Sequence, residues 1–238
     1  MVDPAHPKGD TVYYYGYDIW YFAIIAVSLV LGGITQAYIK STYAKWSKVP
    51  SGIGATGADV ARRMLDEGGA RGCAIGHVGG TLTDNYNPAE NCLHLSNDNY
   101  AGGSVASVAV ACHEAGHAIQ TAERFGPAQF RAALVPAVSF AQGTWTLVFL
   151  IGAVMGLSGL MSAAVVLFAA TVLFQIVTLP VEIDASRRAI AYLDRTGADV
   201  DRKGARQVLV AAALTYVAAA LVSILNLLYL MSRTNRRR

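Results

Sequence analysis

Apolar residues collect in four long windows of the chain, and polar segments separate them. The windows run from Ile19 to Ile39, from Ala132 to Met155, from Leu160 to Leu179 and from Val208 to Met231. Each is close to the ~20 mostly apolar residues that a helix needs to cross a bilayer. The pattern therefore predicts transmembrane helices at 19–39, 132–155, 160–179 and 208–231, with an N-terminal tail at 1–18 and a basic tail at 232–238.

Residues 40–131 form the longest polar segment and show the patterns of a small α+β unit. Ala58 to Glu67 has the spacing of a short amphipathic helix. Cys73 to Val78 and Asn91 to Ser96 have the pattern of short strands, and the connection at 79–88 is rich in turn residues. We therefore expect a mainly α-helical membrane protein with about four transmembrane helices and a small α+β, zincin-like catalytic segment.

Composition supports the membrane assignment and excludes some functions. Hydrophobic residues make up 54% of the chain and charged residues only 15%, whereas soluble domains have about 25% charged residues. The apolar windows make the lipid bilayer an expected partner. The net charge of +3 is modest, so nucleic acid is not an expected partner. Cys73, Cys92 and Cys112 are odd in number and have no CxxC spacing, which suggests neither a disulfide framework nor a thiolate zinc site.

The N-terminal segment resembles an anchor rather than a cleaved leader. No basic region precedes the first window, and the window is longer than the apolar core of a signal peptide. Tyr13, Tyr14, Tyr15 and Tyr17 match an interfacial aromatic belt at its mouth. We therefore expect the first window to remain as a transmembrane helix.

The candidate chemistry lies in an HExxH motif, His113-Glu114-Ala-Gly-His117. An apolar helix is expected here at about 104–125, with Ser104 as its N-cap. Residues four apart share one helix face, so His113 and His117 can both direct a ring nitrogen at one metal ion. Glu114 is turned by about 100° from His113, which suits a general base for a zinc-bound water.

A surface helix that carries the same letters by chance is the alternative interpretation. The flanks oppose it, because Val108, Val110, Ala111, Ala115 and Ile119 make the helix apolar nearly all round. Burying two imidazoles and a carboxylate without partners costs about 1 to 3 kcal/mol for each unsatisfied group. A bound metal removes that cost, so the pattern favours one Zn²⁺.

A catalytic zinc needs a third protein ligand and an open position for water. The candidates within reach of the motif's side of the membrane are His77, Glu90, His94, Glu123, Glu182 and Asp184. The short 156–159 connection predicts a tight hairpin that returns the chain to that side, which favours Glu182. Pro180 can occupy a first helical turn, so we expect a helix at 180–207 to present Glu182. Pairing of Glu182 with a nearby arginine is the competing interpretation.

Several stretches resemble the YugP-like membrane zinc metallopeptidases, which are distantly related to the HtpX and CAAX prenyl protease group. The matching stretches are Leu82-Thr-Asp84-Asn85-Tyr86-Asn87-Pro88, Leu95-Ser96, Val110 to Gln120 around the HExxH, Leu134-Val-Pro136, Leu173 to Arg188, and Ala211 to Ala220. The resemblance implies that His113 and His117 are zinc ligands, Glu114 the catalytic base, and Glu182 the third ligand.

The chain departs from the family pattern at three positions. Ser186 stands where the wider group has Asp after its Glu-x-x-Ala stretch, Asn85 stands where the turn motif is expected to have His, and Asn87 where it is expected to have Asp. These departures leave the HExxH untouched.

The motif predicts a membrane-embedded zinc endopeptidase acting on a peptide or membrane-protein substrate. In zinc peptidases an edge strand beside the metal commonly holds the substrate backbone, and Leu93 to Ser96 suits that role, with His94 and Leu95 as substrate contacts. Arg187, Arg188 and His94 are candidates to stabilise the oxyanion, and structural ion pairs are the alternative use of the arginines. A catalytically silent zinc-containing scaffold or partner-binding subunit is the alternative, and a homo-oligomer or a further membrane partner stays open.

Membrane orientation is predicted from the basic residues. Most of the 19 Lys and Arg lie on the side of the HExxH motif, which by the positive-inside rule places the active site in the cytoplasm. The basic tail at 232–238 argues for the opposite orientation. We expect the plasma membrane of a prokaryote with a cytoplasmic active site.

Overall fold

Four long helices dominate the computed structural model, which describes residues 19–196 and 201–235. They are α1 (Ile19–Trp46), α5 (Gly126–Val154), α6 (Ser158–Arg195) and α7 (Arg202–Asn235), and all four are long and apolar enough to cross a membrane. The chain is a mainly α-helical membrane protein, which confirms the predicted fold class. The aromatic belt expected at 13–17 and the end of the basic tail, 236–238, lie outside the described residues.

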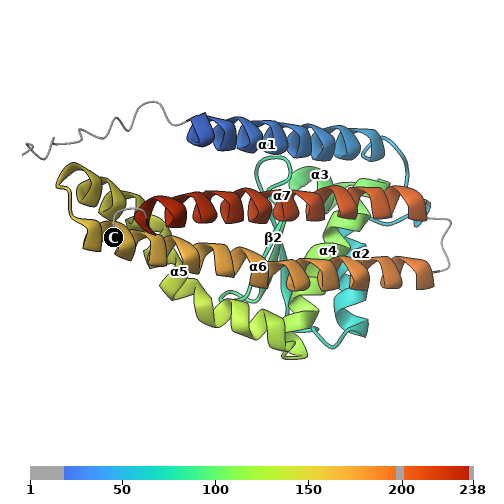
Figure 1. The fold of residues 1–238 in the computed structure, drawn as a ribbon. Coiled ribbons are helices and arrows are strands. Elements are labelled where there is room, and N and C mark those ends of the chain that lie inside the picture. The colour runs from blue at the N-terminus through green and yellow to red at the C-terminus, as the bar shows by residue number, and fades with distance from the viewer. Residues whose placement is uncertain (1–18, 197–200, 236–238) are drawn as a thin grey trace, which may run out of the picture.

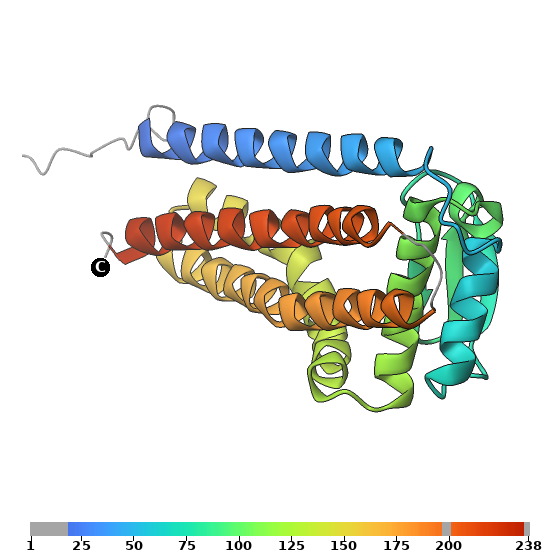
Figure 2. The same ribbon diagram turned by 90° about the vertical axis from the view of Figure 1, so that its right-hand side faces the viewer.

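The long helices lie side by side, and the remaining elements gather at one end of them (Figures 1 and 2). α1 packs on α7, α7 on α6 and α6 on α5. The short elements are α2 (Gly57–Glu67), β1 (Ala74–Val78), β2 (Asn85–Asn87), β3 (Cys92–Ser96), α3 (Asn97–Ala101) and α4 (Val105–Ala122). The first turn of α1 and the last turn of α7 lie at the opposite end (Figure 2).

The helices extend past the predicted spans at the end that carries the short elements. Apolar windows mark only the part that suits lipid, whereas the hydrogen-bonded backbone continues into the polar unit. The structure also differs from the prediction of a separate helix at 180–207, because Pro180 lies inside α6. Proline lacks an N–H and commonly breaks helices, but membrane helices tolerate it where neighbouring groups satisfy the freed carbonyl. Glu182 therefore lies on the same rigid helix as the third span.

The short amphipathic helix forms as predicted and is well capped. Thr56 accepts a hydrogen bond from the Asp59 N–H, and the Asp59 carboxylate accepts one from the Thr56 N–H, which is a complete capping box. Val60, Met64 and Leu65 are buried on one side of α2. That side packs against α4.

The sheet has a strand more than the sequence pattern predicts. β3 is the central strand, pairing in parallel with β1 and antiparallel with β2. The 79–88 connection therefore does not simply turn, since Asn85, Tyr86 and Asn87 within it form the edge strand β2. Two asparagines disfavour a strand locally, so tertiary pairing decides this segment.

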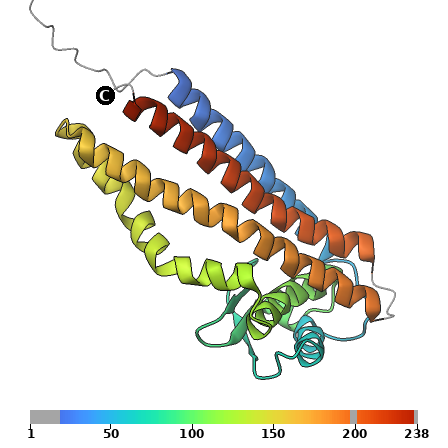
Figure 3. The ribbon, with the colours of Figure 1, turned by 60° about the horizontal axis from the view of Figure 1, so that its bottom comes forward.

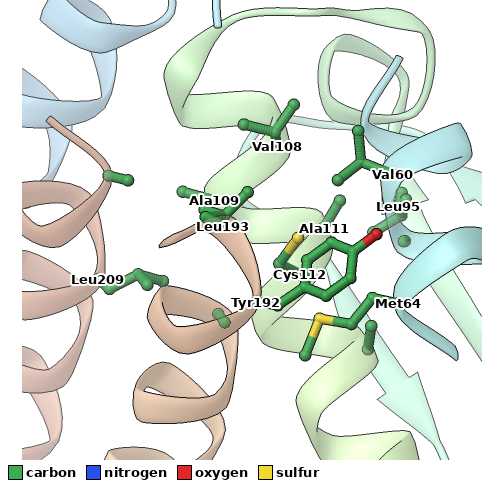
Figure 4. Close-up of a cluster of buried hydrophobic side chains, with 14 of the residues drawn as sticks. Val60, Met64, Leu95, Val108, Ala109, Ala111, Cys112, Tyr192, Leu193 and Leu209 are labelled. Atoms are coloured by element: carbon green, nitrogen blue, oxygen red, sulfur yellow. The ribbon is translucent and has the colours of Figure 1, made fainter. Parts of the chain in front are cut away.

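α4 runs through the middle of the polar unit and crosses the ends of the long helices (Figure 2). Its apolar surface is buried on both sides, by Val60 and Met64 of α2 and by Tyr192 and Leu193 of α6 (Figure 4). Leu209 of α7 completes this cluster (Figure 4). Burial nearly all round, predicted from the flanks of the HExxH, is confirmed.

Gly116, between the two histidines of the motif, allows α4 and α6 to approach closely. A Cβ at this position would lie 2.9 Å from the Ala185 carbonyl oxygen and 3.1 Å from the Ala185 Cα. Backbone atoms cannot move aside as side chains do. The absence of a side chain at 116 therefore sets the distance between the HExxH and Glu182.

We expect Gly116→Ala to destabilise the protein by about 1 to 3 kcal/mol through overpacking, although alanine normally favours a helix by about 1 kcal/mol. Thermal unfolding in detergent would measure the stability. Zinc titration would measure the zinc affinity, which depends on the distance between the ligands. Gly143→Ala is the matched control, because a Cβ at 143 meets no atom within 4 Å. Equal behaviour of the two variants would contradict the close approach.

Candidate metal centre

Three side chains from two helices converge on one point. His113 and His117 lie one turn apart on α4, and Glu182 comes from α6. Glu182 Oε2 is 3.3 Å from His113 Nε2 and 3.6 Å from His117 Nε2. Their potential ligand atoms all lie within 4.8 Å of one another. The structure therefore brings together the three residues that the sequence selects as ligands.

Gln120 fixes the proton position on His117. Its amide nitrogen donates to the Val181 carbonyl and to the Asp184 carboxylate, both at 2.8 Å. The amide oxygen of Gln120 therefore faces His117 Nδ1, at 3.0 Å, and can only accept. Nδ1 of His117 therefore carries a proton, and in the neutral ring the lone pair of Nε2 points at Glu182.

Ser186 serves His113 in the corresponding way. Its hydroxyl lies 3.1 Å from His113 Nδ1, where its oxygen can accept a hydrogen bond from the ring N–H. This is the position at which the wider group has Asp. A neutral hydroxyl thus replaces a carboxylate behind the ligand, and the departure noted in the sequence has a defined place in the site.

The donor set fits a cation. The two Nε2 lone pairs and a carboxylate oxygen face one another, and Glu182 Oε2 is buried with no hydrogen-bond donor among residues 19–196 and 201–235. Burial tends to lower the pKa of His117, but the nearby carboxylates of Glu182 and Glu114 raise it above its ordinary value. Two nitrogens and one oxygen at this spacing are ligands that zinc accepts.

Glu114 lies beside this point and outside the ligand set. Its side chain is buried, and burial raises the pKa of its carboxyl, while the nearby imidazoles of His113 and His117 oppose the rise. A positive charge at the ligands would favour the ionised form in the same way. The carboxylate is therefore positioned to take up a proton close to the ligands.

A cleft of about 460 Å³ opens over the ligands. One wall is formed by the turn that leads into β2, and the others by α4, α5, α6 and α7. Arg131 on α5 points a guanidinium nitrogen to within 3.9 Å of Glu182 Oε1. Tyr216 on α7 also lines the cleft. Both residues could donate hydrogen bonds to a molecule in the cleft.

The turn before β2 is held by a buried polar network that includes Asp84. The Asp84 carboxylate accepts hydrogen bonds from the Ser96 N–H at 2.7 Å and from the Asn99 amide at 2.9 Å. Asn99 in turn accepts from the Tyr43 hydroxyl at 2.7 Å, which links the cleft wall to α1. Asn87 accepts from the N–H of Ala89 and so stabilises the turn after β2.

The strand that was predicted to hold the substrate, β3, does not line the cleft. β1 pairs with β3 over its whole length, and β2 pairs with Cys92 to His94 on the other side. The side chain of Leu95 is fully buried. His94 contacts Glu90 at 2.8 Å. Neither His94 nor Leu95 lines the cleft. The structure thus differs from the expectation that His94 and Leu95 contact the substrate. The sequence pattern did not predict β2, which is the edge strand beside the cleft.

The two arginines that were considered as oxyanion stabilisers do not line the cleft. Arg188 pairs with Asp184 at 2.6 Å and with Glu123 at 2.7 Å, and Arg187 does not line the cleft. The sequence did not identify Arg131 and Tyr216 as cleft residues. Arg131 looks like a charge that flanks the 132–155 window, and Tyr216 looks like one of the apolar residues of the 208–231 window. Gln120 could have been found, since it follows His117 by three positions on the same face of the helix.

Ser186→Asp is expected to tighten zinc binding, because a carboxylate behind His113 would make its ring more basic. Such outer partners typically change metal affinity by about 10 to 100-fold. Competition with a chromogenic chelator would measure the dissociation constant. Ser186→Ala should weaken binding, and identical constants for the two variants and the wild type would contradict a role for Ser186.

Comparison with known proteins adds to the geometry. The family described as "Putative neutral zinc metallopeptidase" matches residues 21–235. A Bacillus subtilis (strain 168) protein named "Putative membrane protease YugP" is 43% identical over 212 residues, which cover 88% of this chain and 94% of the relative. No solved structure matches the chain significantly.

Proposed function

The chain belongs to the neutral zinc metallopeptidase family, and from this premise we propose that it is a membrane-embedded endopeptidase with one Zn²⁺ held by His113, His117 and Glu182. The observation that carries the proposal is the meeting of three acceptor atoms, with Glu182 Oε2 buried and without a donor among the described residues. Three protein ligands leave a position open for water, as in catalytic zinc sites.

Each residue of the site has a distinct task. Zinc, when bound, supplies a Lewis acid that polarises the scissile carbonyl and makes a water molecule acidic. Glu114 accepts the proton of the attacking water and passes it to the leaving amine. Gln120 and Ser186 keep the two imidazoles in the tautomer that binds metal. Glu114 must be ionised at the start.

The developing negative charge on the carbonyl oxygen needs donors. Arg131 and Tyr216 are the candidates because both line the cleft beside Glu182. Preorganised donors of this kind typically contribute about 10² to 10³-fold in kcat. They replace the arginines and the histidine that the sequence suggested.

The substrate backbone can pair with β2 instead of β3. β2 is an edge strand, and the residues from Asp84 to Tyr86 line the cleft. An extended peptide added to this edge would pass beside the ligands. We therefore propose the same mode of binding, addition of the substrate as a strand, but at β2 instead of β3.

A cytoplasmic active site in a prokaryotic plasma membrane remains part of the proposal. The site lies at the end of the helices that carries Lys40, Lys45 and Lys48. Positive charge beside a span favours the cytoplasmic side.

Removing the metal tests the function directly. Detergent-purified protein is expected to contain close to one zinc per chain and to hydrolyse unfolded casein. Treatment with 1,10-phenanthroline should abolish cleavage, and added zinc should restore it. Cleavage that survives complete zinc removal would overturn the proposal.

The alternative is a scaffold that keeps zinc without hydrolysing peptides. Glu114 favours the enzyme, since a structural site needs no buried carboxylate next to its ligands. Stoichiometric zinc with no cleavage of casein or of any membrane protein would favour the scaffold.

A further inference from the structure

The cleft over the ligands is bounded by membrane helices as well as by the polar unit. Ala132 and Val135 contribute from α5, and Tyr216 contributes from α7. These positions belong to helices that are long and apolar enough to cross a membrane. The cleft therefore reaches from the polar unit into the region of the spans.

α5 and α7 do not close this end of the cleft. Both pack along α6, but among the described residues they have almost no contact with each other. α5 bends on its way from α4 to the hairpin with α6, and its first part diverges from α7 (Figure 3). Pro136 lies inside α5 at the beginning of the span, where a proline commonly bends a helix.

The rim of the opening is apolar and exposed. Val135 on α5 is 44% exposed and Tyr216 on α7 is 41% exposed. Apolar side chains that are exposed on a membrane helix face lipid, so this side of the cleft opens toward the bilayer.

The length of α6 places the ligands at the edge of the bilayer. From Ser158 to Glu182 the helix spans about 36 Å at ~1.5 Å per residue. The hydrocarbon core is about 30 Å thick. With the α5–α6 hairpin at the far surface, Glu182 lies just beyond the hydrocarbon, so a molecule in the cleft can touch lipid and the catalytic groups at once.

We infer that the substrate is a membrane-anchored protein whose juxtamembrane segment enters the cleft sideways, between α5 and α7. This inference rests on the proposed peptidase function. The apolar residues of the segment contact Val135 and Tyr216 at the rim, and its extended backbone runs beside β2. The scissile bond then lies within a few residues of the end of the substrate's own transmembrane helix.

Three reporters that share one casein segment test the inference. In the first, the segment directly follows a single transmembrane helix. In the second, about 30 Gly and Ser residues separate it from the same helix, a flexible spacer of roughly 30 Å r.m.s.. The third is the soluble segment. All three are incubated with wild-type protein in proteoliposomes, with its active site facing outward.

The first reporter is expected to be cleaved at least tenfold faster than the second. The spacer keeps the segment at the membrane surface, so this ratio reports position relative to lipid and not local concentration. Equal rates for the first two reporters would overturn lateral entry while leaving the peptidase function standing. Failure to cleave any of the three reporters, with or without bound zinc, would overturn the proposed peptidase function and this inference with it.

Photo-crosslinking locates the path. In the Glu114→Gln protein, p-benzoylphenylalanine at Val135 or Tyr216 is expected to capture the first reporter. The matched controls are Val154 and Leu228, which are 80% and 59% exposed on the same two helices but do not line the cleft. Capture at the controls as strong as at the rim would contradict entry between α5 and α7.

Discussion

Glu114→Gln is expected to lower casein hydrolysis by about 10² to 10⁴-fold, the usual contribution of a general base, while zinc stays bound. The amide has nearly the shape of the carboxylate but cannot take a proton from water. Because Glu114 is buried next to both histidines and is not one of the clustered ligands, its replacement removes the base without removing the metal.

Kinetics and elemental analysis on the same preparation separate these two effects. Glu123→Gln is the matched control, since Glu123 is the C-cap residue of the same helix and pairs with Arg188 at the surface. It should hydrolyse casein nearly as wild type does. Full activity in Glu114→Gln would show that another group takes the proton, and loss of zinc would show that Glu114 helps to hold the metal.

Glu182→Ala is expected to lose zinc, and with it all hydrolysis. The carboxylate is the ligand that α6 supplies, and its removal leaves two imidazoles, which bind zinc far more weakly than a three-ligand site. The zinc content of purified protein should fall well below one per chain. Elemental analysis after dialysis against a weak chelator would measure it.

Two further variants guard against loss of fold. Glu182→Gln preserves the volume of the side chain and should also bind zinc weakly, because an amide oxygen is a poorer ligand than a carboxylate. Glu123→Ala, a carboxylate removed from the surface, should keep its zinc. Circular dichroism should show unchanged helix content in all of them, and stoichiometric zinc in Glu182→Ala would remove Glu182 from the ligand set.

The local sequence was sufficient to predict the long helices and the spacing of residues along them. The four apolar windows predicted the membrane helices, and the i, i+4 spacing of His113 and His117 on an apolar helix predicted a buried pair of ligands. The short connection at 156–159 predicted that Glu182 returns to the side of the motif. These inferences hold because length, periodicity and chain return are properties of adjacent residues.

Tertiary structure alone decided which groups surround the ligands. β2 forms because β3 offers an edge to Asn85–Asn87, and this pairing makes β3 the central strand of the sheet. Arg131 and Tyr216 reach the cleft because α5 and α7 pack on α6. Each role depends on the separation and rotation of helices that are far apart in the chain.

The approach of α4 and α6 shows the physical reason most directly. Gly116 reads in the sequence as a small residue inside a motif, and only the packing shows that any side chain there would strike the backbone of Ala185. Gln120 likewise acts through Val181 and Asp184, more than sixty residues later in the chain. Periodicity fixes the face on which a residue lies, whereas contact between distant faces fixes what that residue can do.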